Sequence, residues 1–318
     1  MRVDAPSVSD DLFLLEFLLS CGLRQGRSMP KCSAWHGAFV HMFRLLYFVV
    51  FSTAILSRSA AQADVALVEM FAKTPSVYVL DGPKALALHS TNIENKEASR
   101  NGLTLAWAVI PSRHYLLTVK DVQREGDVGD LFGEIECGGS PIIVNGGFYG
   151  YAASTNRRIP MGLVIASGIK VSSIRRWKFG GAVLDGTKKE KVVSVAHLKG
   201  IGHLRNALQS MPMLVWNHKN GIRQDGGPAV DRVAVGATRD NDWIVIGAFG
   251  TEGLGVTLKE FADLILALPS LGGVSVESAL NMDGGPSAHI YVPKMGKHFG
   301  EPGHTFLPNV VCFRSQEK

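Results

Sequence analysis

The sequence predicts an α+β fold: a single domain built mainly on mixed or antiparallel β-sheet with a few helices. Short runs rich in Val, Ile, Leu and aromatic residues recur between Gly, Asn and Asp turns, a pattern typical of strands. Strands do not alternate with helical segments, which argues against a doubly wound parallel sheet. Residues 64–318 contain no linker or internal repeat, so we expect them to form one domain.

The expected strands are short apolar runs bounded by turn residues. They cover residues 77–80, 103–110, 115–119, 142–144, 163–166, 192–196, 233–237 and 244–249. Asn101-Gly102 and Asp240-Asn241 stand where tight hairpin turns are expected.

Helical periodicity is clear in one segment. Apolar side chains share one helix face at Leu258, Phe261, Leu264, Ile265 and Leu268. Thr257 and Glu260 form a capping box at the start, and Pro269 marks the end. We therefore give Glu260 a structural role, as part of this capping box, rather than a catalytic one. A shorter helix is expected over residues 204–209.

The composition is that of a globular protein. The 318 residues are 46% hydrophobic and 19% charged, with a formal charge of +5, which excludes a disordered chain. Four cysteines in this length exclude a disulfide-stapled miniprotein. Because no block of basic residues is present, we expect no nucleic-acid partner and no polybasic membrane tail.

Residues 1–63 are predicted to be a leader. The charged start Met42-Phe43-Arg44, the uncharged run 45–56 and the small-x-small site Ala61-Gln62-Ala63 form a secretory signal peptide over about 42–63. The run is too short for a stable membrane anchor, because a spanning helix needs about 20 apolar residues. We therefore expect a secreted, periplasmic protein of residues 64–318.

The stretch 1–41 does not have the features of a signal peptide. Our hypothesis is that translation starts at Met42, and a peptide from 1–41 found by mass spectrometry in the intact protein would contradict it. Cleavage after Ala63 leaves two cysteines, Cys137 and Cys312. They either pair in an oxidising compartment or remain two separate buried thiols.

Three stretches place polar residues and glycines at the end of an apolar strand. They are 142–149, 231–236 and 279–287. Each taken singly is most simply a turn, but their combination is much less expected by chance.

With three further segments, these stretches resemble the phosphodiester glycosidase family. The matching motifs, in the family's order, are Asn145–Tyr149, 160–165, 209–215, Arg232–Gly236, 255–260 and Asn281–Ser287. One departure is Pro286, which replaces the third glycine of the last motif. Proline removes one backbone donor there, so an N–H nest would depend on Gly284 and Gly285 alone.

The resemblance implies a glycosidase that cuts a GlcNAc-like sugar-1-phosphodiester at the anomeric C–O bond. The leaving phosphomonoester has a second pKa of about 6, so one carboxylate can suffice where ordinary glycosidases use two. Asp283 is our candidate, as nucleophile, base or transition-state stabiliser. Arg232 is expected to bind the phosphate through a bidentate fork.

The same resemblance implies a set of substrate-binding residues. Asn145 and Asn281 are expected to orient sugar hydroxyls, and Ser287 is a candidate phosphate donor, although an exposed loop serine is at least as good an interpretation. The expected backbone donors to phosphate are the N–H groups of Gly146, Gly147, Gly284 and Gly285. The natural substrate is expected to be phosphorylated carbohydrate of the cell envelope or an exopolysaccharide.

Other acids and histidines are given structural interpretations. Asp225, Asp231 and Glu252 are interpreted as solvated loop charges, and His289 as a core or sheet-face residue. No zinc-ligand spacing is present, so we expect no metal cofactor, while an oxygen-ligated Ca²⁺ or Mg²⁺ stays open because such ligands leave no spacing signature.

Two rival functions remain. A metal-dependent phosphodiesterase would need a His/Asp cluster for its metals, and none is visible. A non-catalytic module that binds anionic polysaccharide gains some weight from Pro286. The sugar, the aglycone and the oligomeric state stay open.

Overall fold

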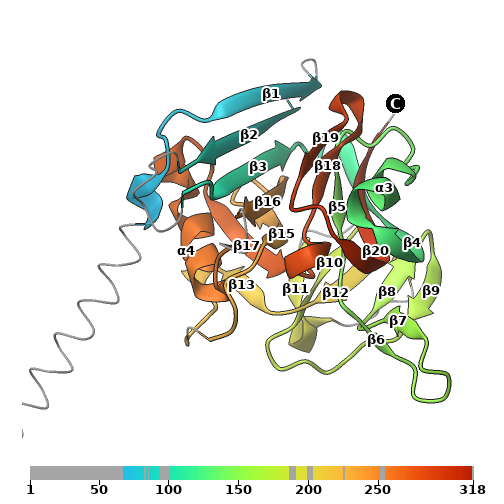
Figure 1. The fold of residues 1–318 in the computed structure, drawn as a ribbon. Coiled ribbons are helices and arrows are strands. Elements are labelled where there is room, and N and C mark those ends of the chain that lie inside the picture. The colour runs from blue at the N-terminus through green and yellow to red at the C-terminus, as the bar shows by residue number, and fades with distance from the viewer. Residues whose placement is uncertain are drawn as a thin grey trace, which may run out of the picture. The chain divides into compact units, whose positions relative to one another are not determined.

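The computed structural model describes residues 67–81, 84, 86–93, 101–185, 191–198, 203–224, 226–250 and 255–316. The predicted leader, 1–63, and the predicted start at Met42 lie outside these residues. Every strand pair among the described residues is antiparallel, and helices are few, which confirms the predicted α+β fold built mainly on sheet (Figure 1).

The first sheet has eight strands. Their spatial order is β1 (Ser76–Asp81), β2 (Leu86–Asn92), β3 (Thr104–Ile110), β16 (Trp243–Phe249), β15 (Arg232–Thr238), β17 (Val276–Asn281), β13 (Met213–Trp216) and β14 (Lys219–Asn220). The turn at Asp240-Asn241 joins β15 to β16, as predicted, and Asn241 has the positive φ of 62° that such a turn uses.

Two five-stranded sheets and a hairpin complete the described sheet structure. The second sheet has the order β11 (Val192–Ser194), β10 (Gly181–Leu184), β12 (Ala207–Ser210), β8 (Val164–Ala166) and β9 (Ile169–Ser172). The third has the order β19 (Lys297–Phe299), β18 (Ile290–Val292), β5 (Ile143–Asn145), β20 (His304–Ser315) and β4 (Tyr115–Asp127). The hairpin is β6 (Tyr149–Tyr151) with β7 (Arg158–Pro160).

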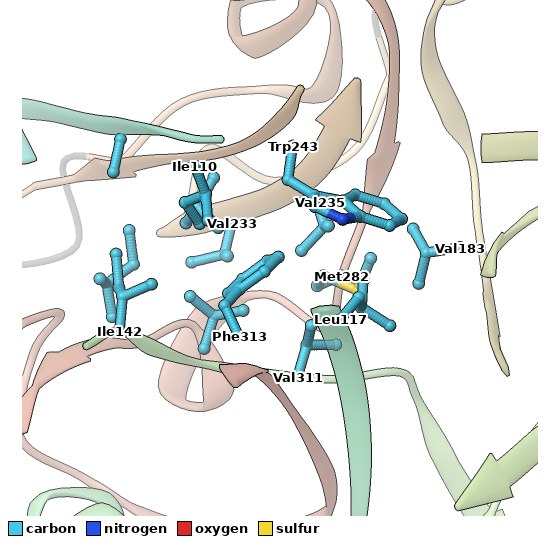
Figure 2. Close-up of a cluster of buried hydrophobic side chains, with 14 of the residues drawn as sticks. Ile110, Leu117, Ile142, Val183, Val233, Val235, Trp243, Met282, Val311 and Phe313 are labelled. Atoms are coloured by element: carbon cyan, nitrogen blue, oxygen red, sulfur yellow. The ribbon is translucent and has the colours of Figure 1, made fainter. Parts of the chain in front are cut away.

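The main core lies where the three sheets face one another. Figure 2 shows side chains of all three in contact, with Val235 and Trp243 from the first sheet, Val183 from the second, and Val311 and Phe313 from the third. The opposite face of the first sheet packs on α4 (Leu258–Ala267) through a second buried cluster. Both faces of β15 and β16 are therefore buried, which accounts for their continuous apolar sequences.

The helix predictions have different outcomes. Helix α4 begins at the predicted capping box, in which Thr257 and Glu260 exchange side-chain and backbone hydrogen bonds. The predicted helix over 204–209 is wrong, because Ala207–Ser210 form the fully buried strand β12, paired on both sides. A second helix, α3 (Val128–Gly133), packs against β4 and β20.

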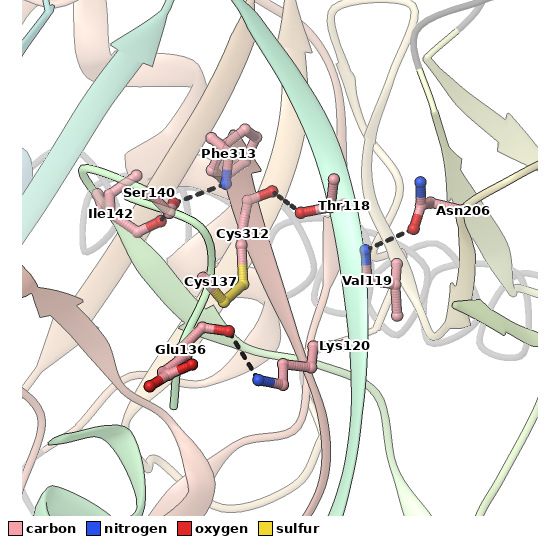
Figure 3. Close-up of a disulfide and its surroundings, with 10 residues drawn as sticks. All are labelled: Thr118, Val119, Lys120, Glu136, Cys137, Ser140, Ile142, Asn206, Cys312 and Phe313. Atoms are coloured by element: carbon pink, nitrogen blue, oxygen red, sulfur yellow. Dashed lines mark hydrogen bonds between the residues drawn. A yellow bond between two sulfur atoms is a disulfide. The ribbon is translucent and has the colours of Figure 1, made fainter. Parts of the chain in front are cut away.

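A disulfide joins Cys137 to Cys312, which decides between the two alternatives for these cysteines (Figure 3). Their Cα atoms are 6.1 Å apart, and Cys312 is a buried residue of β20. The bond ties the loop after α3 to the third sheet across 175 residues of sequence. Among the described residues, no helix is both long and apolar enough to span a membrane.

Candidate active site

The end of β5 and the end of β17 meet at one point of the fold. The backbone N–H of Asp283 donates to the carbonyl of Gly146 at 3.0 Å. The side-chain amide of Asn145 donates to the carbonyl of Asp283 at 2.7 Å. Hydrogen bonds thus hold together two motifs that lie 138 residues apart in sequence, and Asp283 is part of this junction.

Asp283 lines a cavity of about 450 Å³ beside this junction. The cavity is built from the loop after β17, the β6–β7 hairpin, β4 and the start of β20. Its lining residues are Glu125, Phe148, Tyr149, Arg158, Asp283, Gly284, Pro286, Ser287, His304, Thr305 and Phe306. The cavity therefore brings together carboxyl, guanidinium, imidazole, hydroxyl and aromatic groups.

Burial raises the pKa of the Asp283 carboxyl to about 6. Three groups oppose that rise by favouring the charged form: the Ser287 hydroxyl, the Gly284 N–H at 3.0 Å and the Arg232 cation. A carboxyl that titrates near neutral pH inside a cavity is a common feature of catalytic sites.

Ser287 is buried, and its Oγ lies 2.8 Å from Oγ1 of Thr305. Ser287 comes from the short 3₁₀ turn Gly285–Ser287, and Thr305 from β20. Pro286 stands within the first turn of this element, where its fixed φ suits the backbone and its missing N–H costs no internal hydrogen bond. The departure from the family motif is therefore accommodated locally.

Arg158 supplies a cation to the cavity that the sequence analysis did not predict. Its guanidinium lies 2.7 Å from the Glu125 carboxylate and over the rings of Tyr149 and Phe306, at 5.6 and 5.9 Å from their centroids. Glu125 also lies 3.3 Å from His304. The only sequence signal for Arg158 is its place two residues before Pro160 of a family motif.

Arg232, the cation predicted to bind phosphate, lies behind the Asp283 loop. Its Nε donates to the Val256 carbonyl at 3.2 Å, and its Nη2 to the Pro228 carbonyl at 2.8 Å. The side chain is buried and does not line the cavity of Asp283. It acts on Asp283 through its charge, and direct binding of a phosphate stays a prediction.

Comparison with known proteins decides the family. The family described as phosphodiester glycosidase matches residues 138–314, more than half of the chain. The chain belongs to the phosphodiester glycosidase family. No curated protein sequence gives a significant match.

One solved structure shares the fold of this member of the family. The catalytic domain of zebrafish N-acetylglucosamine-1-phosphodiester alpha-N-acetylglucosaminidase, auto-inhibited by its pro-peptide, matches with a TM-score of 0.52 and 13% identity. That match covers 78% of this chain and 89% of the zebrafish chain. A hypothetical protein from Synechocystis matches with a TM-score of 0.47 and 12% identity, over 73% of this chain and 62% of that one.

Two asparagines of the family motifs are fully enclosed. Asn145 donates to Asp283 and accepts a bond from the N–H of His289 at 3.0 Å. Asn281 donates to the carbonyls of Met211 and Met282, at 3.1 and 2.7 Å. In this structure both brace the backbone around Asp283, and contact with sugar hydroxyls stays a prediction.

The four glycine N–H groups predicted as phosphate donors all have acceptors within the protein. Those of Gly146 and Gly147 donate to the main-chain and side-chain oxygens of Asn309, at 3.0 and 2.9 Å. Those of Gly284 and Gly285 donate to Asp283 Oδ1 and to the carbonyl of Asp231, at 3.0 and 2.9 Å. A phosphate would have to displace these acceptors to reach the four groups.

Asn309 is a further residue that the sequence analysis missed. It is fully buried in β20, and a Cβ on Gly146 would stand 1.9 Å from its Oδ1. Gly146 therefore has to be a glycine for Asn309 to hold this turn. The available signal was one asparagine in the apolar run Phe306–Phe313.

Asp231 is not the solvated charge that we expected. It is 7% exposed and accepts bonds from the N–H groups of Gly250 and Glu301, and its burial raises its pKa to about 6. Asp225 and Glu252 lie outside the described residues. His289 is a core residue, as predicted, and hydrogen bonds to His298.

The described residues contain no group of three or more His, Cys, Asp and Glu side chains placed to hold a metal ion.

Proposed function

We propose that this protein hydrolyses a sugar-1-phosphodiester with a GlcNAc-like sugar, at the bond between the anomeric carbon and oxygen. The observation that supports it is the Asp283 carboxyl, with its pKa raised to about 6, in one cavity with the Arg158 cation and the Ser287–Thr305 hydroxyl pair. A phosphodiester presents an anion to the cation and hydroxyls, and an electrophilic carbon to the carboxylate.

Each group has a role in this reaction. Arg158, oriented by Glu125, binds the non-bridging phosphate oxygens, and Ser287 or Thr305 donates to the same oxygens. The C–O bond breaks with its electron pair going to the phosphate, and water adds to the sugar. The phosphomonoester leaves without a general acid, because its second pKa is about 6.

The ionised carboxylate of Asp283 acts at the anomeric carbon, in one of three roles. As a nucleophile it would form a covalent glycosyl intermediate; as a base it would take a proton from water; as a stabiliser it would face the oxocarbenium-like transition state. All three roles need the charged carboxylate. Asn145 and Gly146 hold the backbone of Asp283 in place for any of them.

A neighbouring hollow gives room for a longer substrate. It measures about 540 Å³ and shares Glu125, Arg158 and Phe306 with the cavity of Asp283. A chain that continues beyond the phosphate would lie along it, past Tyr151 and Arg157. This continuity supports a polymeric substrate, such as phosphorylated cell-envelope material or an exopolysaccharide.

The proposed place of action is outside the cytoplasm, in the periplasm. The signal-peptide pattern of 42–63 supports it, and so does the Cys137–Cys312 disulfide, since such bonds persist in oxidising compartments. After cleavage the protein would keep no stable membrane anchor, and its partner would be phosphorylated carbohydrate rather than nucleic acid.

The test is hydrolysis of an α-GlcNAc-1-phosphodiester in ¹⁸O-labelled water by protein secreted from cells that express the full chain. Cleavage of C–O places the label in the free sugar, whereas cleavage of P–O places it in a phosphate product. The Asp283→Asn variant should lose turnover, and Asp121→Asn, an exposed acid on β4, should keep it.

Other outcomes would favour the rival functions. Label in phosphate, with activity lost in EDTA, would overturn the proposal in favour of a metal-dependent phosphodiesterase. Binding without turnover across a panel of sugar phosphodiesters, unchanged in Asp283→Asn, would favour a non-catalytic module.

A further inference from the structure

A second cavity, of about 280 Å³, opens at the far end of β17 from Asp283. Glu277 and Ser278, at the start of β17, line it, whereas Asp283 follows the other end of the strand. Five residues of extended chain separate Ser278 from Asp283, roughly 17 Å. The two cavities share no lining residue.

Lys191 is the unusual feature of this second cavity. Its side chain lines the cavity, although the residue is only 5% exposed. Its ammonium lies 5.4 Å from the centroid of the Trp243 ring and has no hydrogen-bond or ion-pair partner among the described residues. Buried charges are normally paired, because taking an ammonium out of water is costly.

The groups around Lys191 offset only part of the cost of removing its ammonium from water. Burial lowers the pKa of Lys191, and the Asp242 carboxylate, too far away for an ion pair, opposes the shift. A cation–π contact stabilises a desolvated ammonium less than a hydrogen-bonded counter-ion would. An anion in the cavity would supply the missing partner.

The other residues that line the cavity indicate which further groups the ligand would carry. Arg239 adds a second, exposed cation, and Asn217 and Asn241, at two hairpin turns, add amide groups. Glu277 contributes the one carboxylate among the described lining residues, and His218 contacts it. Trp216 supplies a half-buried aromatic ring, stacked on His197, against which the apolar face of a sugar ring can lie.

We propose that this cavity binds an acidic sugar, with its carboxylate between Lys191 and Arg239 and its ring against Trp216. The site is separate from the cavity of Asp283, and the proposal does not depend on the proposed hydrolysis. In a protein acting on polysaccharide, such a site would hold a uronate-bearing chain.

The test measures binding of glucuronic acid and of glucose to the full chain by titration calorimetry and ligand-observed NMR. We expect glucuronic acid to bind in the millimolar range or tighter, and glucose at least tenfold more weakly. Lys191→Gln and Arg239→Gln should each weaken glucuronic acid binding at least fivefold. Lys294→Gln, an exposed lysine between β18 and β19, is the matched control and should not change it.

Two further variants distinguish binding in this cavity from binding in the cavity of Asp283. Arg239→Gln changes an exposed residue, so it tests the proposal even if Lys191→Gln fails to fold. Asp283→Asn should bind glucuronic acid like the wild type, because Asp283 does not line this cavity. Equal binding of glucose, binding unchanged in Arg239→Gln, equal competition by inorganic phosphate, or no binding of glucuronic acid would each overturn the proposal.

Discussion

The side-chain amide of Asn145 donates to the main-chain carbonyl of Asp283, with 2.7 Å between nitrogen and oxygen. Asn145 ends β5 in the third sheet, and Asp283 follows β17 in the first. The bond therefore joins two sheets at the point where the carboxyl enters the cavity. Asp283 is positioned by buried backbone contacts rather than by a flexible loop, which favours a preorganised site.

The pH dependence of the rate should follow Asp283. Its pKa is raised to about 6, so the carboxyl is protonated below that pH and ionised above it. Because each proposed role needs the ionised form, kcat/KM should rise through about pH 6 and level off above about pH 7. No falling limb from a general acid is expected, since the leaving group needs no proton. Initial rates from pH 4.5 to 9 check this, and a bell-shaped profile centred near pH 6 would contradict it.

Asp283→Asn should stabilise the protein at alkaline pH. The folded pKa of about 6 lies above the unfolded value of about 3.9. Ionisation of Asp283 therefore lowers the free energy of unfolding as the pH rises from about 4 to about 6, and the loss stays constant above about pH 6. After a discount for partial exposure, the amide should add about 1–2 kcal/mol at pH 8 and nearly nothing at pH 4. Urea melts at both pH values measure this, with Asp121→Asn as control. An equal effect at both pH values would refute it.

The sequence predicted which strands exist better than it predicted the residues at which they begin and end. All eight expected strands exist, because alternation of short apolar runs and turns reports burial in a sheet. The helix predicted over 204–209 is wrong, because Ala207–Ser210 form a strand that includes the polar Gln209. In the structure the Oε1 of Gln209 accepts bonds from the N–H groups of Leu163 and Arg175, so a fully buried strand can hold it.

The site was predictable where the residues that form it are adjacent in sequence. Asp283, Gly284 and Ser287 line the cavity and share one motif. Arg158 and Asn309 were missed because their roles arise from contacts between segments far apart in sequence: Arg158 with Glu125, and Asn309 with Gly147. Single residues on separate strands leave no spacing pattern. Only the register of the strands brings Arg158 to the cavity and Asn309 to the turn beneath Asp283.

Arg158→Gln should weaken substrate binding. Loss of a charged hydrogen-bond donor to phosphate should lower kcat/KM roughly 10- to 100-fold, mainly through a higher KM. Arg124→Gln is the matched control, since Arg124 lies on β4, pairs with Glu134 on the surface and does not line the cavity. Steady-state kinetics with the sugar phosphodiester measure the difference. A KM that is the same in both variants would exclude Arg158 from the phosphate site.

Gly146→Ala should disrupt the junction beneath Asp283. The added Cβ would lie 1.9 Å from Oδ1 and 2.8 Å from the carbonyl oxygen of Asn309, so the backbone must shift. We expect a loss of about 1–3 kcal/mol in stability, with a fall in activity beyond that. Gly133→Ala, at the end of α3, is the control, because its Cβ would meet nothing within 4 Å. Thermal melts and rates of both variants check this; similar melting temperatures would contradict it.

Arg232→Gln should move the rising limb of the pH–rate profile to higher pH. The Arg232 cation lowers the pKa of Asp283, so removing the charge lets burial raise that pKa further. The variant should also lose stability, because the bonds to the carbonyls of Val256 and Pro228 would be weakened or lost.

Arg232→Lys is the comparison that separates charge from geometry. It keeps the cation, so its rising limb should stay near that of the wild type even if its maximal rate falls. If Arg232 instead binds the phosphate through two parallel hydrogen bonds, Arg232→Gln would raise KM and leave the rising limb of the profile at the same pH. Profiles of kcat/KM for the two variants and the wild type, taken between pH 5 and 9, decide between these roles.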